Sequence, residues 1–452
     1  MSPLTIKQIP FDRGHPITGH LKEFINDRFT MQMRMMKKMG PIYSFNVGKY
    51  KVTYLSKPEY IRHILQENYK NYKKNVFYDE LKIILGQGLV TSEGEFWRKQ
   101  RKMIQPAFHH KQIEHFSQLM VLATKKMMTK WDESASQKTP INIDEDMKSL
   151  TMEIVAQCLF SHDTAAFAKA ATNSVNVVLD WSKSRMESLV KSPQWLPTQS
   201  NREYNKAFNA LKNIVMGIIQ ERREMLNRPD DLLTTMIEMT DEDSNEGMND
   251  HQLFDEILTL FMAGHETTAH TLVWTWFLLS KNPHVRNKLS DEVDFIISNA
   301  DVSLAQIGQL SYTKMVLQES MRYIPAVWGI GREALTDDMI DGFTIPKGAT
   351  VGVSIYQMHH HPEYWENPEG FEPERFNPNN ESKINKWVYM PFGGGPRACV
   401  GNAFAMMESQ IILAMLSKRY TLNLRADIPI EFDPGITLRP KYEFFMDIKK
   451  RI

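Results

Sequence analysis

A single long stretch of the chain, residues 251–281, restricts the possible folds more than any other. It is predominantly apolar, begins after two typical helix-cap residues, Asn249 and Asp250, and ends before a proline. At ~1.5 Å per residue such a helix is roughly 46 Å long, enough to cross a whole domain. Its middle contains His265 and Glu266, and ionisable residues at that depth argue against a membrane span. The sequence therefore predicts a large domain built around one central helix.

The totals of the sequence fit one large domain. No Pro/Gly/Ser-rich linker, low-complexity tract or internal repeat divides the 452 residues. Hydrophobic residues make up 42% of the chain, which is enough for a sizeable core. There are 54 basic and 54 acidic residues, and this balance argues against a general nucleic-acid binder. We expect a single domain over 1–452, with a β-rich lobe at about 40–60 and 335–360 and a helical lobe formed by the remainder.

Cysteine usage and the N-terminal residues indicate the compartment. The chain has two cysteines, Cys158 and Cys399, which excludes a disulfide framework and suits a reducing cytoplasm. The first ten residues contain no apolar run long enough for a signal peptide or a membrane anchor. We therefore expect a soluble, cytoplasmic protein. Cys158 lies on the apolar face of a predicted helix, and we interpret it as core packing.

Shorter helices and a few strands are predicted around the central helix. Alternating apolar residues at 42–55, around Gly48 and Lys49, are typical of a β-hairpin. The pair Asp341-Gly342 predicts a second, tight hairpin, and 350–355 continues this small β region. Helical periodicity occurs at 57–67, 95–102, 113–137, 143–160, 201–226, 312–323 and 402–418. The expected fold class is mainly α with small β-sheets (α+β).

The glycine-rich stretch from Phe392 to Gly401 suggests a binding function. It contains Cys399 shortly before a predicted helix, and glycines at 393, 394, 395 and 401 permit tight turns and close approach to a bulky group. A thiolate in such a loop can be the single protein ligand of a metal, and haem iron accepts a lone cysteine in this way. Taken alone, the pattern also fits a buried structural cysteine beside a turn.

The middle of the long helix contains residues that are unfavourable inside a helix. The segment Ala263–Thr268 contains a glycine, which costs about 1 kcal/mol relative to alanine inside a helix. It also contains two adjacent threonines, which compete for backbone hydrogen bonds. Violations of this kind in a buried helix often mark function, although an ordinary kinked core helix would show them too.

Together these patterns resemble the cytochrome P-450 superfamily of haem-thiolate monooxygenases, of the soluble bacterial type, over nearly the whole chain. The cysteine signature of that family, Phe-x-x-Gly-x-Arg-x-Cys-x-Gly, is met by Phe392, Gly395, Arg397, Cys399 and Gly401. Its other motifs are met by Glu319 and Arg322, by Pro373–Phe376, by Ala263–Thr268, and by Trp97 and Arg101. The resemblance implies the family's fold, in which the long central helix lies over a haem.

The resemblance also implies roles for individual residues. Cys399 would bind the iron of haem b as its axial thiolate, and Glu266 and Thr267 would be catalytic, relaying protons to the oxygen site. His265 would point away from the haem. The remaining expected cofactor contacts are Trp97, Arg101, Ala263, Gly264, Arg332, Phe392, Arg397 and Gly401, with a solvated surface role equally open for Arg332. Glu319, Arg322 and Arg375 would form a buried structural triad.

Separate redox partners are implied as well. Electrons would come ultimately from NAD(P)H through a reductase and a ferredoxin or flavodoxin, and the enzyme would be a monomer. An acidic partner could dock near the cysteine side of the haem by electrostatic steering, although an ordinary solvated face is the alternative. The basic residues considered for this surface are Arg98, Lys99, Arg101, Lys102, Lys418 and Arg419.

The substrate stays open at this level. By resemblance, the pocket would be lined by 75–90, 181–197, 261–267 and 326–330. Trp181, Trp195 and Trp328 offer flat apolar faces that could pack alkyl chains or stack on sugar rings. One alternative is hydroxylation of an aliphatic or terpenoid C–H bond, and the other is oxidative O-demethylation of a methoxylated polar compound such as a methyl sugar. A haem sensor or electron carrier without turnover is a different class, against which the acid–threonine pair argues.

Overall fold

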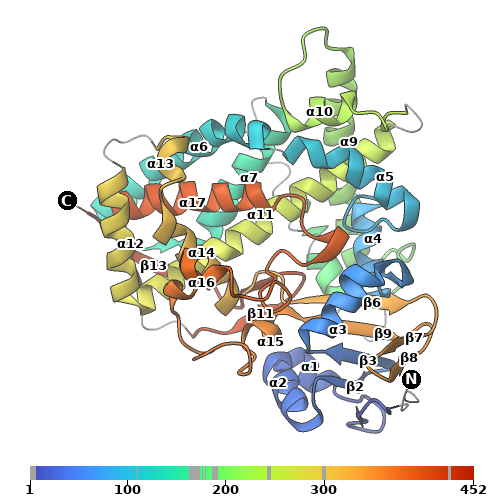
Figure 1. Ribbon diagram of the computed structural model, residues 1–452. Helices are drawn as coiled ribbons and strands as arrows, with labels where there is room; N and C mark the ends of the chain where they lie inside the picture. The colour runs from blue at the N-terminus through green and yellow to red at the C-terminus, as the bar shows by residue number, and fades with distance from the viewer. Residues whose placement is uncertain are drawn as a thin grey trace.

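The long helix is present as α11, Asp250–Lys281. A capping box closes its first turn: the Asn249 side chain accepts the N–H of Gln252, and the Gln252 side chain accepts the N–H of Asn249. At the other end the Asn282 N–H donates to the Leu278 carbonyl. In the computed structural model α11 runs through the middle of the helical part (Figure 1). The predicted span and cap are confirmed.

The structure describes residues 7–108, 110–161, 174–175, 177–178, 180–185, 192–241, 246–297, 302–425 and 429–451. Helices dominate, and α7 packs along α11. The other helices have these bounds: α1 Leu21–Asn26, α2 Arg28–Met39, α3 Pro58–Arg62, α4 Asp79–Leu85, α5 Gly94–Ile104, α6 His110–Gln137, α7 Ile143–Phe160, α9 Gln199–Glu224, α10 Leu232–Glu238, α12 Pro283–Ile296, α13 Leu304–Ile307, α14 Ser311–Tyr323, α15 Ile355–His359, α16 Pro378–Glu381 and α17 Asn402–Arg419.

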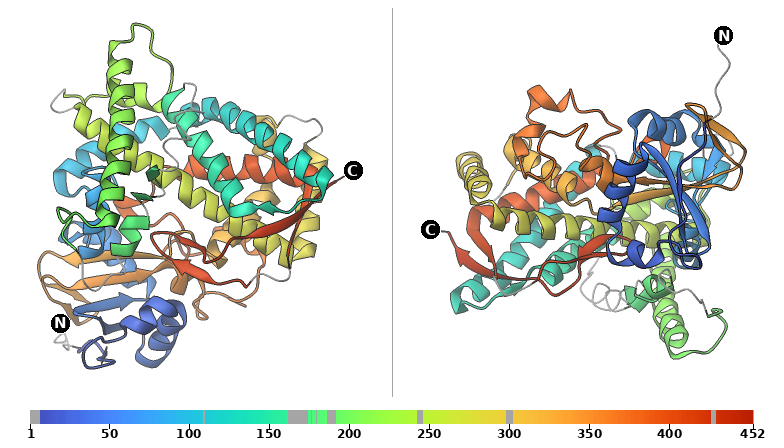
Figure 2. Two further views of the ribbon diagram at one scale, coloured as in Figure 1. Left: turned by 180° about the vertical axis from the view of Figure 1, so that it is seen from behind. Right: turned by 90° about the horizontal axis from the view of Figure 1, so that it is seen from below.

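In the described ranges the strands form one six-stranded sheet and three smaller ones. The large sheet has the order β1-β2-β3-β9-β6-β4, and the three-stranded sheet has the order β10-β13-β5. Figure 2 shows from behind and from below that the large sheet stays on one side of the helical part. The bounds are β1 Phe11–Asp12, β2 Ile42–Val47, β3 Tyr50–Leu55, β4 Tyr72–Lys73, β5 Ile141–Asn142, β6 Gly329–Ala334, β7 Asp338–Ile340, β8 Phe343–Ile345, β9 Thr350–Ser354, β10 Tyr420–Leu424, β11 Phe432–Pro434, β12 Leu438–Pro440 and β13 Phe445–Lys450.

Both predicted hairpins are confirmed. Strands β2 and β3 pair antiparallel from Ile42 opposite Leu55 to Val47 opposite Tyr50. Strands β7 and β8 pair across Asp341-Gly342, where both residues have positive φ, 49° and 83°. That geometry is typical of a type I′ turn, which favours Asp-Gly. The fold class, mainly α with small sheets, is confirmed.

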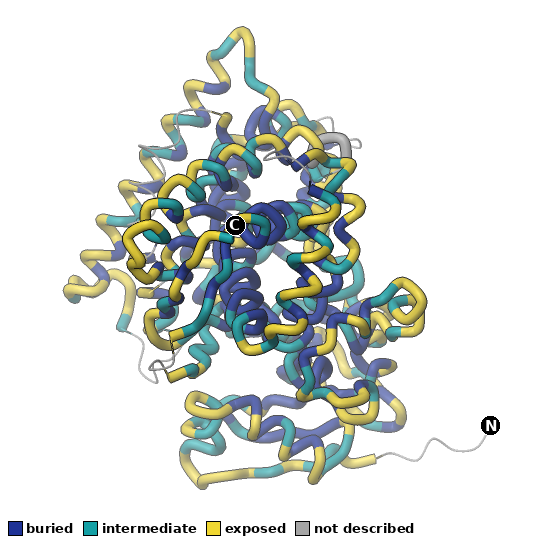
Figure 3. Tube along the Cα trace, turned by 90° about the vertical axis from the view of Figure 1, so that its left-hand side faces the viewer, coloured by how far each residue is buried: buried dark blue, intermediate teal, exposed yellow. Residues whose placement is uncertain are grey.

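The main hydrophobic core follows α11. Residues of α7 and α17 share one buried cluster with α11, and a second cluster lies between the large sheet and the chain that follows it. Figure 3 shows the buried central helices surrounded by exposed outer ones. Within the described part of the chain, every helix is too short or too polar to cross a membrane.

Candidate active site

The loop that holds Cys399 is fixed by backbone contacts. The Cys399 N–H donates to the Phe392 carbonyl at 2.9 Å. At Gly395 φ is +70°, and a Cβ there would lie 1.9 Å from the Leu65 carbonyl oxygen. No side chain fits in that space, so Gly395 lets the loop pack onto the π-helical turn His63–Glu67. The cysteine is thereby held just before the start of α17.

A cavity of about 350 Å³ separates this loop from α11. Cys399, Phe392 and Gly401 line one side of it, and Ala263, Gly264 and Thr267 of α11 line the other. The two motifs that were far apart in the sequence therefore face the same space. A Cβ on Gly264 would lie 3.0 Å from a Val155 methyl group, so this glycine also lets α7 approach α11 closely.

The Cys399 thiol fits the role of a thiolate ligand. Burial raises the pKa of this thiol, while the Gly401 N–H and the Arg101 guanidinium oppose that rise. Both groups stabilise negative charge on sulfur, which is the form that binds a metal. The side chain is accessible through the cavity.

Cations at the cavity fit a dianionic cofactor. Lys74, Arg332 and Arg397 line it, and Arg397 forms an ion pair with Glu93. When Lys74 is protonated, three positive charges against one negative charge leave an excess of two in this group of four side chains. Burial and the charges of Arg397 and Arg332 lower the pKa of Lys74 to about 6, despite Glu93. Haem has two propionates, which would balance the excess, and therefore the residues present fit haem.

Lys74 is a site residue that the sequence analysis missed. Its ammonium donates to the Ser92 carbonyl at 3.0 Å and lies 4.0 Å from the nearer Glu93 oxygen. It stands in a run of lysines, Lys70, Lys73 and Lys74, which has the appearance of an ordinary solvated surface. Arg332 is buried as well, 8% exposed, which excludes the surface role that the sequence left open.

Trp97 and Arg101 lie together on the inner face of α5. The Arg397 guanidinium stacks over the Trp97 ring at 4.0 Å from its centroid. Arg101 donates from Nη1 to the Ala398 carbonyl at 2.8 Å, next to the cysteine. The structure thus brings Trp97, Arg101 and Arg397 to the cavity, where the resemblance placed them.

The two side chains of the acid–threonine pair lie in different environments. Thr267 lines the cavity, and its hydroxyl donates to the Ala263 carbonyl at 2.7 Å. Glu266 is buried, at 8% exposed, and is absent from the described cavity lining. Its charge instead helps to raise the pKa of Arg439 on β12. Among the described residues, Glu266 is therefore not part of the cavity wall.

His265 points away from the cavity. Its Nδ1 lies 2.9 Å from the Phe261 carbonyl, and its own carbonyl accepts the Thr151 hydroxyl at 2.9 Å. The ring is 2% exposed and shares the core between α11 and α7. This placement fits packing and hydrogen bonding to the helix, as the sequence analysis expected.

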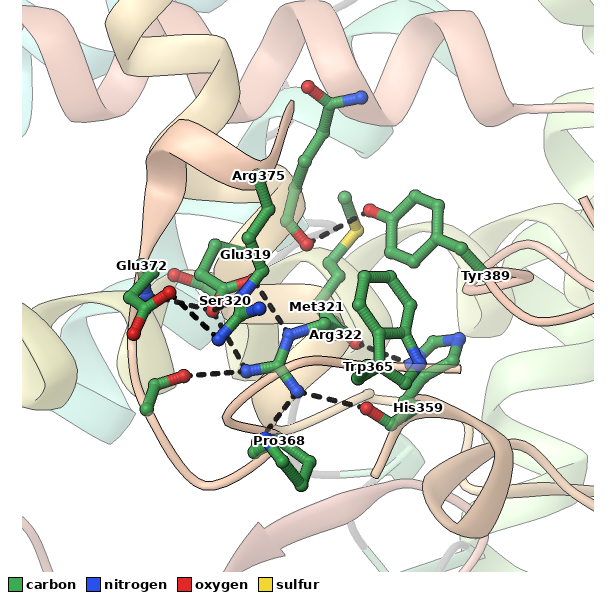
Figure 4. Close-up of polar contacts among 12 residues, drawn as sticks. Glu319, Ser320, Met321, Arg322, His359, Trp365, Pro368, Glu372, Arg375 and Tyr389 are labelled. Carbon is green, nitrogen blue, oxygen red and sulfur yellow. Dashed lines mark hydrogen bonds and ion pairs between the residues drawn. The ribbon is translucent and has the colours of Figure 1, made fainter. Parts of the chain in front are cut away.

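Glu319, Arg322 and Arg375 form a buried network away from the cavity. Arg322 forms two hydrogen bonds to the Glu319 carboxylate, at 2.7 and 2.8 Å, and Arg375 Nε lies 3.4 Å from the same carboxylate. Arg322 also donates to the carbonyls of His359, Pro368 and Gly370. Figure 4 shows how the guanidinium joins α14 to two loops. The hydrogen-bonding groups of Arg322 are thus used within the protein, which fits a role in holding the fold and not in binding a substrate.

The proposed tryptophan platforms are occupied or lie elsewhere. Trp181 stacks on Tyr204 at 3.9 Å and donates to the Asn201 side chain, and Trp195 is 81% exposed. The described residues of 181–197 do not line this cavity, and 186–191 lie outside the described residues. Cys158, interpreted as core packing, is fully buried and also borders the cavity.

The basic docking residues do not form one patch near Cys399. Lys418 pairs with Asp294 at 3.1 Å, and Arg419 pairs with Asp132. Both stand at the last turn of α17, whose first turn follows Cys399, so they lie roughly 25 Å away at ~1.5 Å per residue. The expectation that they sit on the cysteine side is wrong, because the helix carries them to its far end. Lys99 and Lys102 remain on α5.

Comparison with known proteins matches this chain to one family. The family model described as Cytochrome P-450 matches residues 9–446. A Cyclooctat-9-en-7-ol 5-monooxygenase of Streptomyces melanosporofaciens is 30% identical, over 88% of this chain and 84% of its own. Cyclooctatin synthase of the same organism is 28% identical, over 95% and 91%. A putative cytochrome P-450, number 132, of Mycobacterium bovis is 30% identical, over 86% of each chain.

Proposed function

The chain belongs to the cytochrome P-450 family and is a monooxygenase of that family, and from this premise we propose that it hydroxylates a C–H bond of an aliphatic or terpenoid substrate. The observation that carries the proposal is the cavity in which Cys399 faces Ala263 and Thr267 of α11. Cys399 would hold the iron of a bound haem through its sulfur, and the haem would supply the activation of O2.

The residues of the chain would bind and orient the cofactor. Lys74, Arg332 and Arg397 would hold the two propionates, with Trp97 supporting Arg397 through the face of its ring. Arg101 and the Gly401 N–H would stabilise negative charge on the Cys399 sulfur, against the burial that raises the pKa of this thiol. Phe392, which lines the cavity with the cysteine, would limit the access of water to it. These contacts pre-organise the site before the substrate enters.

Proton delivery is assigned to Thr267 with Glu266. The Thr267 hydroxyl would release the Ala263 carbonyl and turn into the cavity, where it can donate a proton. Glu266, whose charge acts on Arg439, would replace that proton. Replacing Thr267 by alanine should divert electrons from product to peroxide or water. Unchanged coupling in that variant would place the relay elsewhere.

The substrate proposal rests on the cavity walls and on the relatives. Leu89, Val90 and Leu260 present aliphatic side chains, and Val327 and Ile330 add two more from the opposite wall. Of the two similar Streptomyces proteins, one is named a cyclooctatin synthase and the other a monooxygenase of cyclooctat-9-en-7-ol. Stacking on a sugar ring loses its support, since Trp181 is already stacked on Tyr204. This choice is tested by titrating the enzyme with terpene hydrocarbons, terpene alcohols and methyl sugars. The shift of the haem spectrum reports binding. Tighter binding of the sugars would reverse it.

The cofactor assignment has a direct spectroscopic test. The reduced protein with CO should show the red-shifted absorption band of a thiolate-bound haem. The variant Cys399→His should keep a haem but lose that band, because imidazole donates less electron density. A folded wild-type protein without the band would reject the assignment.

Electron transfer would use separate proteins. We propose NAD(P)H as the ultimate donor, acting through a reductase and a ferredoxin or flavodoxin, with a monomeric enzyme in the cytoplasm. Lys99 and Lys102 on α5 are the docking residues that stay on the same helix as Arg101. Reversing both charges should slow reduction and weaken its dependence on salt. An unchanged rate would move the docking surface to another face.

A further inference from the structure

The loop that joins α4 to α5 presents Leu89 and Val90 to the cavity, and two adjacent acids of α11 hold this loop. The Gln87 N–H donates to Asp255 Oδ2 at 2.8 Å, and the Leu89 N–H donates to Glu256 Oε2 at 3.0 Å. Neither acid belongs to a motif of the sequence analysis, and the proposed function uses neither. Both lie behind the cavity wall, since the described lining includes the loop and not the acids.

Both acids are buried, which costs free energy unless hydrogen bonds compensate for the lost water. Asp255 also lies 3.5 Å from the ring of His251. Glu256 Oε1 has no hydrogen-bond partner among the described residues, so the Leu89 N–H is the bond that this side chain forms there. Burial raises the pKa of Glu256 to about 8, although the Leu89 N–H opposes the rise. Either protonation state keeps a carboxyl oxygen that can accept this N–H.

Two glycines let the loop lie directly on α11. Gly86 has a φ of +51°, and a Cβ there would lie 2.3 Å from the Asp255 carboxylate oxygens. A Cβ on Gly88 would lie 2.0 Å from Thr259 Oγ1. The Thr91 hydroxyl donates to the Gly86 carbonyl at 2.9 Å and closes the loop on itself. The loop is therefore a compact turn with no space for a side chain between it and the helix.

We propose that Asp255 and Glu256 are positioning residues that clamp the loop 86–91 onto α11 and so set how far Leu89 and Val90 reach into the cavity. Leu260, one turn further along α11, lines the cavity as well, so the clamp joins two parts of one apolar wall. The wall then has a fixed shape, which selects the apolar substrates that fit against it. The clamp itself stands on the two hydrogen bonds, while its effect on the substrate rests on the proposed function.

Amide hydrogen exchange of the purified holoenzyme, resolved to single residues, tests the clamp. The Leu89 amide should exchange slowly in wild type, and Glu256→Leu should speed it roughly tenfold, as expected for the loss of one such hydrogen bond. Asp255→Leu should act in the same way on the Gln87 amide. Glu256→Gln should keep most of the protection of Leu89, because its side-chain oxygen still accepts the N–H. Fast exchange of Leu89 in wild type, or equal protection in the Leu and Gln variants, would overturn the inference.

Glu292→Leu is the matched control. Glu292 of α12 accepts the N–H groups of Tyr312 and Thr313 at 2.6 and 2.7 Å, so it holds the start of α14 in the same way. The described lining of the cavity includes none of these three residues. This variant should speed exchange at Tyr312 and Thr313 and leave Leu89 protected. Loss of the Leu89 protection in Glu292→Leu would contradict a local clamp.

Binding of imidazoles to the haem iron tests the effect on the cavity. Imidazole needs only the space at the iron, whereas N-octylimidazole also has to pack its chain against the apolar walls. Glu256→Leu should weaken binding of N-octylimidazole roughly fourfold or more, the factor for one CH2 group that loses its apolar contact, and should hardly change binding of imidazole. Glu256→Gln should restore most of the loss, and Glu292→Leu should show none.

Equal weakening of both ligands in Glu256→Leu, or no weakening of either, would contradict the role in shaping the wall. The exchange measurement does not depend on the chemistry of the iron. Absence of the thiolate CO band in wild type would therefore reject the proposed function and leave the exchange result standing.

Discussion

Two regions of this molecule contain the same short pattern, Glu-x-x-Arg, with opposite outcomes. On α5, Glu95 and Arg98 form an ion pair of 2.7 Å between Arg Nε and Glu Oε2, with side chains 75% and 58% exposed. On α14, Glu319 and Arg322 form an ion pair between the same two atoms at the same 2.7 Å, and both side chains are 0% exposed. The spacing, the paired atoms and their distance are therefore the same, while the burial is opposite; Arg322 also donates a second hydrogen bond to the Glu319 carboxylate.

The difference shows what burial demands of a charge. An exposed pair is solvated and screened, and contributes little. A buried pair needs every donor satisfied, and Arg322 obtains this from Glu319 and three backbone carbonyls. The network is also neutral: Glu319 and Glu372 balance Arg322 and Arg375. The cavity group, with Lys74, Arg332 and Arg397 against Glu93, is the buried cluster that stays unbalanced, and this is why it indicates a ligand.

The largest expected effect separates the two arginine pairs. Arg322→Met should lower the free energy of unfolding by about 3–5 kcal/mol, because it leaves the Glu319 carboxylate and three carbonyls without their donor. Urea unfolding of the haem-loaded protein measures this. A loss of less than about 1 kcal/mol would mean that the network is dispensable.

Haem binding by the unbalanced cluster should depend on pH. Without propionates the pKa of Lys74 is near 6, well below the ordinary lysine value, so between those values haem binding has to restore a proton to Lys74. Binding that takes up a proton weakens as pH rises, by at most about tenfold per pH unit above about pH 6. Haem transfer to an acceptor protein at several pH values measures the slope. Lys74→Met should bind haem more weakly at pH 6 and lose this slope; an unchanged slope in the variant would assign it to another group.

The support of Arg397 by Trp97 should have a moderate effect. Trp97→Leu removes the ring below the guanidinium and should weaken haem binding roughly threefold to tenfold, in line with a partly buried cation–π contact. Trp97→Phe, which keeps a smaller aromatic face, should lose less. Equal losses in the two variants would show that shape matters here and not the π face.

The smallest effect is expected at the exposed pair. Arg98→Met repeats the chemistry of Arg322→Met at the same helical spacing, and should change the free energy of unfolding by less than about 1 kcal/mol. High salt should leave even that difference undetectable, because exposed charges are screened. A destabilisation that matches Arg322→Met would remove burial as the reason for the contrast.

Much of the fold could be predicted from the sequence. The capped apolar run of α11, the alternation of β2 and β3 and the Asp341-Gly342 turn are local signals, and local propensity and packing agree there. The resemblance carried by the cysteine motif and the motif of the long helix also implied that these two segments would face one space. Both kinds of signal lie in neighbouring residues, whose relative positions the chain itself constrains.

The residues that were missed or misplaced depend on distant parts of the chain. Lys74 reads as one lysine of a solvated run until Arg332, some 260 positions later, is placed beside it. Lys418 and Arg419 are close to Cys399 in sequence, and α17 carries them to its other end.

The sequence by itself determined the central helix, the hairpins and the thiolate loop, because each is specified by the order of adjacent residues. Tertiary structure decided which of two Glu-x-x-Arg pairs is structural and which lysine faces the cofactor space. Those outcomes depend on how much water surrounds a charge, and the amount of water is set by residues far away in the chain.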